Sequence, residues 1–78
     1  MNQKQIYHPG YRSLVRKLKA ARLEASLSQE DVARQLGVCR TWVTKVEANE
    51  LGLDLLGLVG LCRVYGLRAG ELILLVEE

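Results

Sequence analysis

Two short helical segments separated by a single glycine constrain the fold of this chain more than any other feature. Ser28 and Asp31 have the spacing of a capping-box variant that begins one helix, and Gly37 ends this helix after about two turns. Four apolar side chains then recur at helical spacing: Cys39, Trp42, Val43 and Val46. Two short helices joined by a glycine-centred turn of about three residues are the sequence form of a helix-turn-helix.

Helical spacing also extends over the rest of the chain. Pro9 suits a first helical turn, so a helix is predicted over roughly residues 10–25. Asp54 caps a further helix that Gly66 ends, and a last helix begins near Arg68 and runs to the carboxyl end. No segment alternates apolar and polar residues as a half-buried strand does. We therefore predict an all-α fold, a compact five-helix bundle that contains the helix-turn-helix.

The length of 78 residues allows one small domain and argues against a self-contained enzyme. We predict a single domain over residues 1–78, with residues 1–10 as a frayed arm. No apolar run reaches the roughly 18 residues of a membrane span, and the polar amino terminus does not resemble a secretory signal. Cys39 and Cys62 are too few and too far apart for a disulfide framework or a CxxC metal site. We expect a cytoplasmic protein without a metal, a cofactor or a small-molecule ligand.

Charge is distributed unequally along the chain. Residues 1–45 carry nine Lys and Arg against three Asp and Glu, whereas residues 46–78 carry two against six. The basic half indicates a polyanionic partner such as nucleic acid, although a solvated helix face has the same composition. Gln29, at the start of the second helix, can meet a phosphate through its side chain and the free backbone N–H groups there. Four further phosphate candidates lie in the first helix: Arg12, Arg16, Lys17 and Lys19.

The third predicted helix, roughly residues 39–48, carries the candidates for reading bases, because the second helix of such a unit enters the major groove. With Val43 and Val46 turned inward, four side chains point outward: Arg40, Thr41, Thr44 and Lys45. Arginine or lysine can pair with guanine, and threonine can contact a thymine methyl group or an acceptor. Trp42 belongs to the apolar stripe, which favours a core or rim position over base stacking. Cys39 is expected to be an inert, partly buried thiol.

Residues 22–50 carry a pattern in which SQEDVARQLGV is followed by an aromatic residue and Val-x-Lys-Val-Glu. The pattern resembles the Cro/lambda-repressor class of helix-turn-helix proteins, also called the Xre family, over roughly residues 12–75. The resemblance implies a five-helix, lambda-repressor-like domain that acts as a dimeric transcription regulator on inverted repeats. It implies an ion pair between Arg22 and Glu47, and phosphate or base contacts by Gln29, Arg40, Thr41, Thr44 and Lys45. Ser26 departs from the family, which usually ends the first helix with a glycine.

The acidic half contains more leucine than one small core needs. Residues 72–76 are five apolar residues in a row, and one helix cannot turn all five toward its own core. Burial of one such side chain is worth roughly 1.5–3 kcal/mol, so we expect the surplus to form a two-fold dimer surface within residues 55–76. Gly57 and Gly60 would let the partner helices approach closely. The residues assigned to this surface are Leu55, Leu56, Val59, Ile73, Leu74, Leu75 and Val76.

Three non-enzymatic interpretations of function follow from the sequence. The first, which we favour, is a transcription regulator that binds double-stranded DNA sequence-specifically, as a homodimer on an inverted-repeat operator. The second is an antitoxin-like interaction module, whose leucine-rich end binds a protein such as the toxin of a toxin–antitoxin pair. The third keeps DNA binding and assigns the chain as the controller protein of a restriction–modification system.

Overall fold

A computed structural model describes residues 3–77, and the side chains from residue 5 onward. Within these residues all regular secondary structure is helical, and the five predicted α-helices are confirmed. A 3-10 helix, η1, precedes them. The elements are η1 (Gln3–Tyr7), α1 (Pro9–Glu24), α2 (Gln29–Leu36), α3 (Arg40–Glu47), α4 (Leu55–Tyr65) and α5 (Ala69–Glu77).

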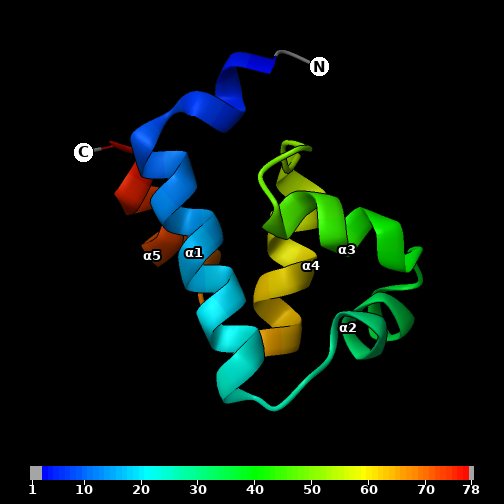
Figure 1. The fold of residues 1–78 in the computed structure, drawn as a ribbon. Coiled ribbons are helices and arrows are strands. Elements are labelled where there is room, and N and C mark those ends of the chain that lie inside the picture. Colours follow the sequence, from blue (N-terminus) through cyan, green and yellow to red (C-terminus); the bar gives the residue numbers. More distant parts are fainter. Residues whose placement is uncertain (1–2, 78) are drawn as a thin grey trace.

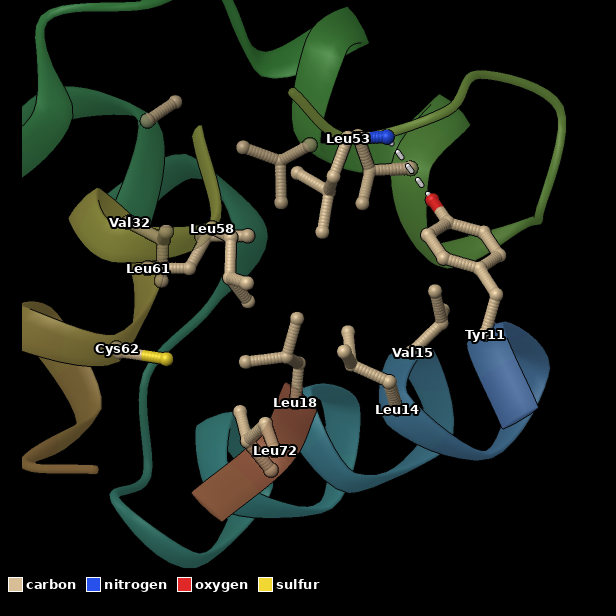
Figure 2. Close-up of a cluster of buried hydrophobic side chains, with 13 residues drawn as sticks. Tyr11, Leu14, Val15, Leu18, Val32, Leu53, Leu58, Leu61, Cys62 and Leu72 are labelled. Carbon is tan, nitrogen blue, oxygen red and sulfur yellow. Dashed lines mark hydrogen bonds between the residues drawn. The ribbon is translucent and has the colours of Figure 1, made fainter. Parts of the chain in front are cut away.

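The helices form two pairs with α4 between them (Figure 1). One pair is α1 with α5, and the other is α2 with α3. Every α-helix contributes to a single core, because each turns an apolar stripe toward the centre (Figure 2). The core side chains are Tyr11, Leu14, Val15, Leu18, Val32, Ala33, Val43, Val46, Leu53, Leu58, Leu61, Cys62 and Leu72.

The short α2 begins and ends where its sequence signals predict. The Ser28 hydroxyl accepts a hydrogen bond from the Asp31 backbone N–H at 2.9 Å, and the Asp31 carboxylate accepts one from the Ser28 N–H at 2.9 Å. These bonds, with one from Arg34, lower the pKa of the Asp31 carboxyl group. Gly37 ends the helix with a φ of 69°, a left-handed conformation in which glycine has no steric penalty.

Two other helix ends also use left-handed backbone, without glycine. Ser26, after α1, has a φ of 58°, and Asn49, after α3, has a φ of 61°. Asparagine tolerates this region better than most residues, and the Asn49 side-chain amide also donates a hydrogen bond to the Ile6 carbonyl group. Ser26 has neither advantage, so the departure from glycine at this position leaves a strained turn.

The frayed arm predicted for residues 1–10 is wrong from Gln5 onward, because side-chain hydrogen bonds hold this segment to the domain. Gln5 Nε2 donates to the Leu53 carbonyl oxygen at 2.8 Å. His8 caps α1, since its Nδ1 accepts from the N–H groups of Gly10 and Tyr11 at 3.0 and 3.3 Å. The rest of the predicted arm lies outside this comparison, because the side chains of residues 1–4 are not among those described.

Glycines in α1 and α4 allow helices of the same chain to approach closely. A Cβ atom on Gly10 would collide with the Leu75 carbonyl oxygen, so α1 and α5 cross backbone against backbone at this point. A Cβ atom on Gly57 would lie 3.0 Å from the Trp42 ring, and one on Gly60 would lie 3.2 Å from Leu36 Cδ2. Gly57 and Gly60 thus make room for Trp42 and Leu36 of the same chain, and the idea that they also serve a partner helix stays a prediction.

Candidate nucleic-acid interface

The helix α3 has two faces of opposite character. Val43 and Val46 are buried, and Trp42 is half-buried where α3 meets α4. The side chains predicted to read bases are all exposed: Arg40, Thr41, Thr44 and Lys45. The structure therefore presents these four polar side chains together on one short helix.

A buried ion pair fixes α3 against α1. The Arg22 guanidinium donates to Glu47 through Nε at 2.6 Å and through Nη2 at 3.0 Å, and the two side chains are only 9% and 7% exposed. This bidentate bond raises the pKa of Arg22 above its usual value. Arg22 Nη1 also donates to the Leu27 carbonyl oxygen at 2.8 Å, which ties the α1–α2 loop to the same pair. The geometry is that implied by the resemblance.

The Gln29 side chain lies between the ion pair and the exposed face of α3. Its Nε2 donates to Glu47 Oε1 at 3.0 Å, and its Oε1 accepts a hydrogen bond from the Thr44 hydroxyl at 2.7 Å. The sequence suggested that this side chain meets a phosphate, whereas the structure turns it toward its own protein. No sequence signal could have indicated the contact, because an amide and a hydroxyl 15 residues apart form no recognised pattern.

The basic residues of α1 lie on two different flanks. Arg12, Arg16 and Lys19 follow each other at intervals of four and three positions, so they share one flank of the helix. Lys17 lies on the other flank, where it lines a hollow with Arg68 and Glu71 of α5. The structure therefore places three of the four phosphate candidates of α1 on one flank and separates Lys17 from them.

Cys39 differs from its predicted environment. It occupies the N-cap position of α3, is exposed, and its side chain makes no capping hydrogen bond. The prediction of a partly buried thiol is wrong, because the N-cap lies outside the helix and turns its side chain away from the Val43 and Val46 stripe. Among the described residues, no three His, Cys, Asp or Glu side chains gather as a metal site.

The residues assigned to a dimer surface do not gather around a single hollow. Leu55, Ile73 and Val76 line an apolar groove of about 340 Å³ between α4, α5 and the start of α1. Leu56 lines a second hollow beside Trp42 and the α2–α3 turn. Leu55, Leu56 and Leu74 are 66%, 79% and 55% exposed. The remaining members of the set, Val59, Ile73, Leu75 and Val76, are half-buried.

Comparison with known proteins agrees with this geometry. A family model described as a helix-turn-helix domain matches residues 13–75, which covers α1 from its second turn through most of α5. The chain has no significant match among curated proteins. No helix within residues 3–77 is both long and apolar enough to cross a membrane. Because the family model covers most of the chain, the protein belongs to the helix-turn-helix domain family.

Proposed function

We propose that the protein regulates transcription by binding double-stranded DNA sequence-specifically, as a homodimer on an inverted repeat. The two-sided α3 carries the proposal. Its apolar face is fixed in the core and by the Arg22–Glu47 pair, while its polar face is exposed. A helix of this kind fits the major groove, which admits one α-helix. The protein is on this proposal a binding protein and not an enzyme.

The side chains of the polar face have distinct roles in this proposal. Arg40, the first residue of α3, reads guanine by donating hydrogen bonds to the O6 and N7 atoms of the base. Thr41, Thr44 and Lys45 contact neighbouring base edges. The backbone N–H groups at the start of α2, at Gln29 and Glu30, are available to a phosphate, because the first turn of a helix lacks internal partners. The side chains on the longer basic flank of α1 contact further phosphates: Arg12, Arg16 and Lys19. Lys17 contributes less.

Selection of bound duplexes from a random DNA pool tests the proposal. We expect an inverted repeat with half-sites about one helical turn apart, and an affinity that falls steeply with salt. Arg40→Ala should weaken binding by about 1–3 kcal/mol and relax the preference at one base pair. Lys17→Ala is the matched control and should leave every base preference unchanged. If Arg40→Ala weakens binding to all sequences equally, Arg40 contacts only phosphate, and if no motif is enriched, the proposal fails.

The apolar groove between α4, α5 and the start of α1 supports the homodimer. Leu55 stands at its edge and is 66% exposed, which is unfavourable unless another apolar surface covers it. Leu55→Glu should convert the dimer to monomers in sedimentation experiments and remove the second half-site from the footprint. Leu56→Glu changes an even more exposed leucine of the same helix that lines the other hollow, and it should leave the dimer intact. If Leu56→Glu gives monomers and Leu55→Glu does not, the dimer interface lies at the second hollow instead.

The exposure of Leu56 favours a second candidate, an antitoxin-like module that binds a protein through the hollow beside Trp42. A purified homodimer that does not bind a dye specific for exposed apolar surface would argue against an obligatory partner of this kind. A restriction–modification controller would use the same DNA-reading residues as the main proposal. The genes next to this one distinguish that role from other forms of regulation.

A further inference from the structure

The amide of Gln29 has only one orientation that satisfies its neighbours. Glu47 presents carboxylate oxygens, which only accept hydrogen bonds, so the NH₂ group of Gln29 must face Glu47. The amide oxygen of Gln29 then faces Thr44, whose hydroxyl lies 2.7 Å away. The same carboxylate is held in place by Arg22. The buried ion pair therefore dictates which atom of Gln29 reaches the exposed face of α3.

The orientation of Gln29 determines what Thr44 can offer to a ligand. A threonine hydroxyl has one hydrogen, and both acceptors in reach belong to the protein: Gln29 Oε1 at 2.7 Å and the Arg40 carbonyl oxygen at 3.2 Å. With its hydrogen directed toward Gln29, the Thr44 oxygen presents only lone pairs to the outside. Thr44 is exposed, so these lone pairs are accessible to a partner in the groove.

We propose that Gln29 is a positioning residue for base specificity, because it makes Thr44 a hydrogen-bond acceptor on the reading helix. This inference rests on the proposed function. In the major groove the donors are the N6 amine of adenine and the N4 amine of cytosine, whereas thymine O4 and guanine O6 are acceptors. Thr44 therefore selects adenine or cytosine at the base that it faces. Inversion of that base pair places a carbonyl oxygen opposite the lone pairs and is disfavoured.

The proposal differs from the phosphate role suggested for the Gln29 side chain. A phosphate contact adds affinity on every sequence and carries no base preference. An oriented Thr44 hydroxyl adds little to affinity for arbitrary DNA and sets a preference at one base pair. The two roles are separated by the pattern of loss across sequences, and a defect in folding would lower the binding of all sequences together.

The test compares binding of the wild-type protein and Gln29→Ala to the best selected site and to a series in which each base pair is inverted in turn. For the wild-type protein, inversion of the pair read by Thr44 should weaken binding roughly five- to tenfold. In Gln29→Ala the hydroxyl keeps only the longer 3.2 Å contact to the Arg40 carbonyl oxygen, which it can leave to donate to a base, so the same inversion should change binding about twofold or less, with other preferences retained. Gln35→Ala, an exposed glutamine of the same helix, is the matched control and should behave as wild type.

Three results would overturn the inference. A uniform loss on all sequences in a Gln29→Ala variant that is folded as the wild type is would assign the side chain to phosphate, and an unchanged preference would show that Thr44 does not depend on Gln29. In the free protein, the Thr44 hydroxyl proton should exchange more slowly with water than that of Thr41. Equal exchange rates would show that the hydrogen bond from Thr44 to Gln29 does not form in solution. If the wild-type protein shows no base preference while the Thr44 proton is protected, the proposed function fails and the hydrogen bond stands.

Discussion

The α2–α3 pair and the α1–α5 pair are stabilised by different kinds of interaction. Directional polar bonds fix the first pair: the capping box at Ser28, the Arg22–Glu47 ion pair, and the Gln29 contacts. The second pair depends on apolar side chains and on the close approach of α1 to α5 at Gly10. Directional bonds specify orientation, whereas apolar burial is largely non-directional. The helix that is proposed to meet DNA in one orientation therefore belongs to the pair with directional bonds.

The largest effect that would separate the two halves is expected at the ion pair. Glu47→Ala leaves the Arg22 charge buried without a partner and should lower the free energy of unfolding by about 3–5 kcal/mol, close to the entire stability of many small domains. Arg34→Ala removes the exposed pair with Asp31 and should cost about 1 kcal/mol or less. Urea denaturation of both variants measures the difference. Similar losses in the two variants would contradict a special role for the buried pair.

An intermediate effect is expected where α1 crosses α5. Gly10→Ala places a methyl group against the Leu75 carbonyl oxygen, and neither backbone segment can move aside easily. We expect a loss of about 1–3 kcal/mol, as for other overpacked contacts. Gly70→Ala is the matched control, because a Cβ atom there meets nothing within 4 Å and alanine favours the helix. Thermal unfolding should rank Gly70→Ala at or above wild type and Gly10→Ala below it.

The smallest effect has the opposite sign and concerns the α1–α2 turn. Ser26→Gly relieves the left-handed strain at this position and should raise the free energy of unfolding by about 1 kcal/mol. Asn49→Gly, at a similar φ, should bring no gain, because it removes the hydrogen bond to Ile6. Chemical denaturation of the two variants in parallel tests the comparison. A gain in both would show that strain, and not the asparagine side chain, decides stability at such turns.

Sequence reasoning succeeded where the signal is local. Ser28, Asp31 and Gly37 define α2 within ten positions. Ser28 and Asp31 form the predicted capping box, and Gly37 adopts the predicted left-handed conformation. The outward orientation of Arg40 and Lys45 likewise follows from the helical spacing of Val43 and Val46. Such features depend only on neighbours along the chain, so one sequence is sufficient to predict them.

Sequence reasoning failed where the cause lies far along the chain. Nothing in the sequence indicates that Trp42 and Leu36 of the same chain pack against Gly57 and Gly60. The ordered segment before α1 was missed for the same reason, since Gln5 is held by the distant Leu53. The contact between Gln29 and Thr44 belongs to this class as well. These contacts join segments that are distant in sequence, so they cannot be inferred from residue types and local spacing alone.

The crossing of α1 and α5 at Gly10 also bears on the order in which the domain folds. The contact between Gly10 and Leu75 closes a loop that contains nearly the whole chain, whereas α2 and α3 are adjacent in sequence. Closure of a long loop is opposed by chain entropy, so the α1–α5 contact is expected to form after the rate-limiting step. Gly10→Ala should then accelerate unfolding and leave the folding rate nearly unchanged. The lifetime of the folded domain is thus determined where its two ends meet, on the side of the molecule away from α2 and α3 (Figure 1).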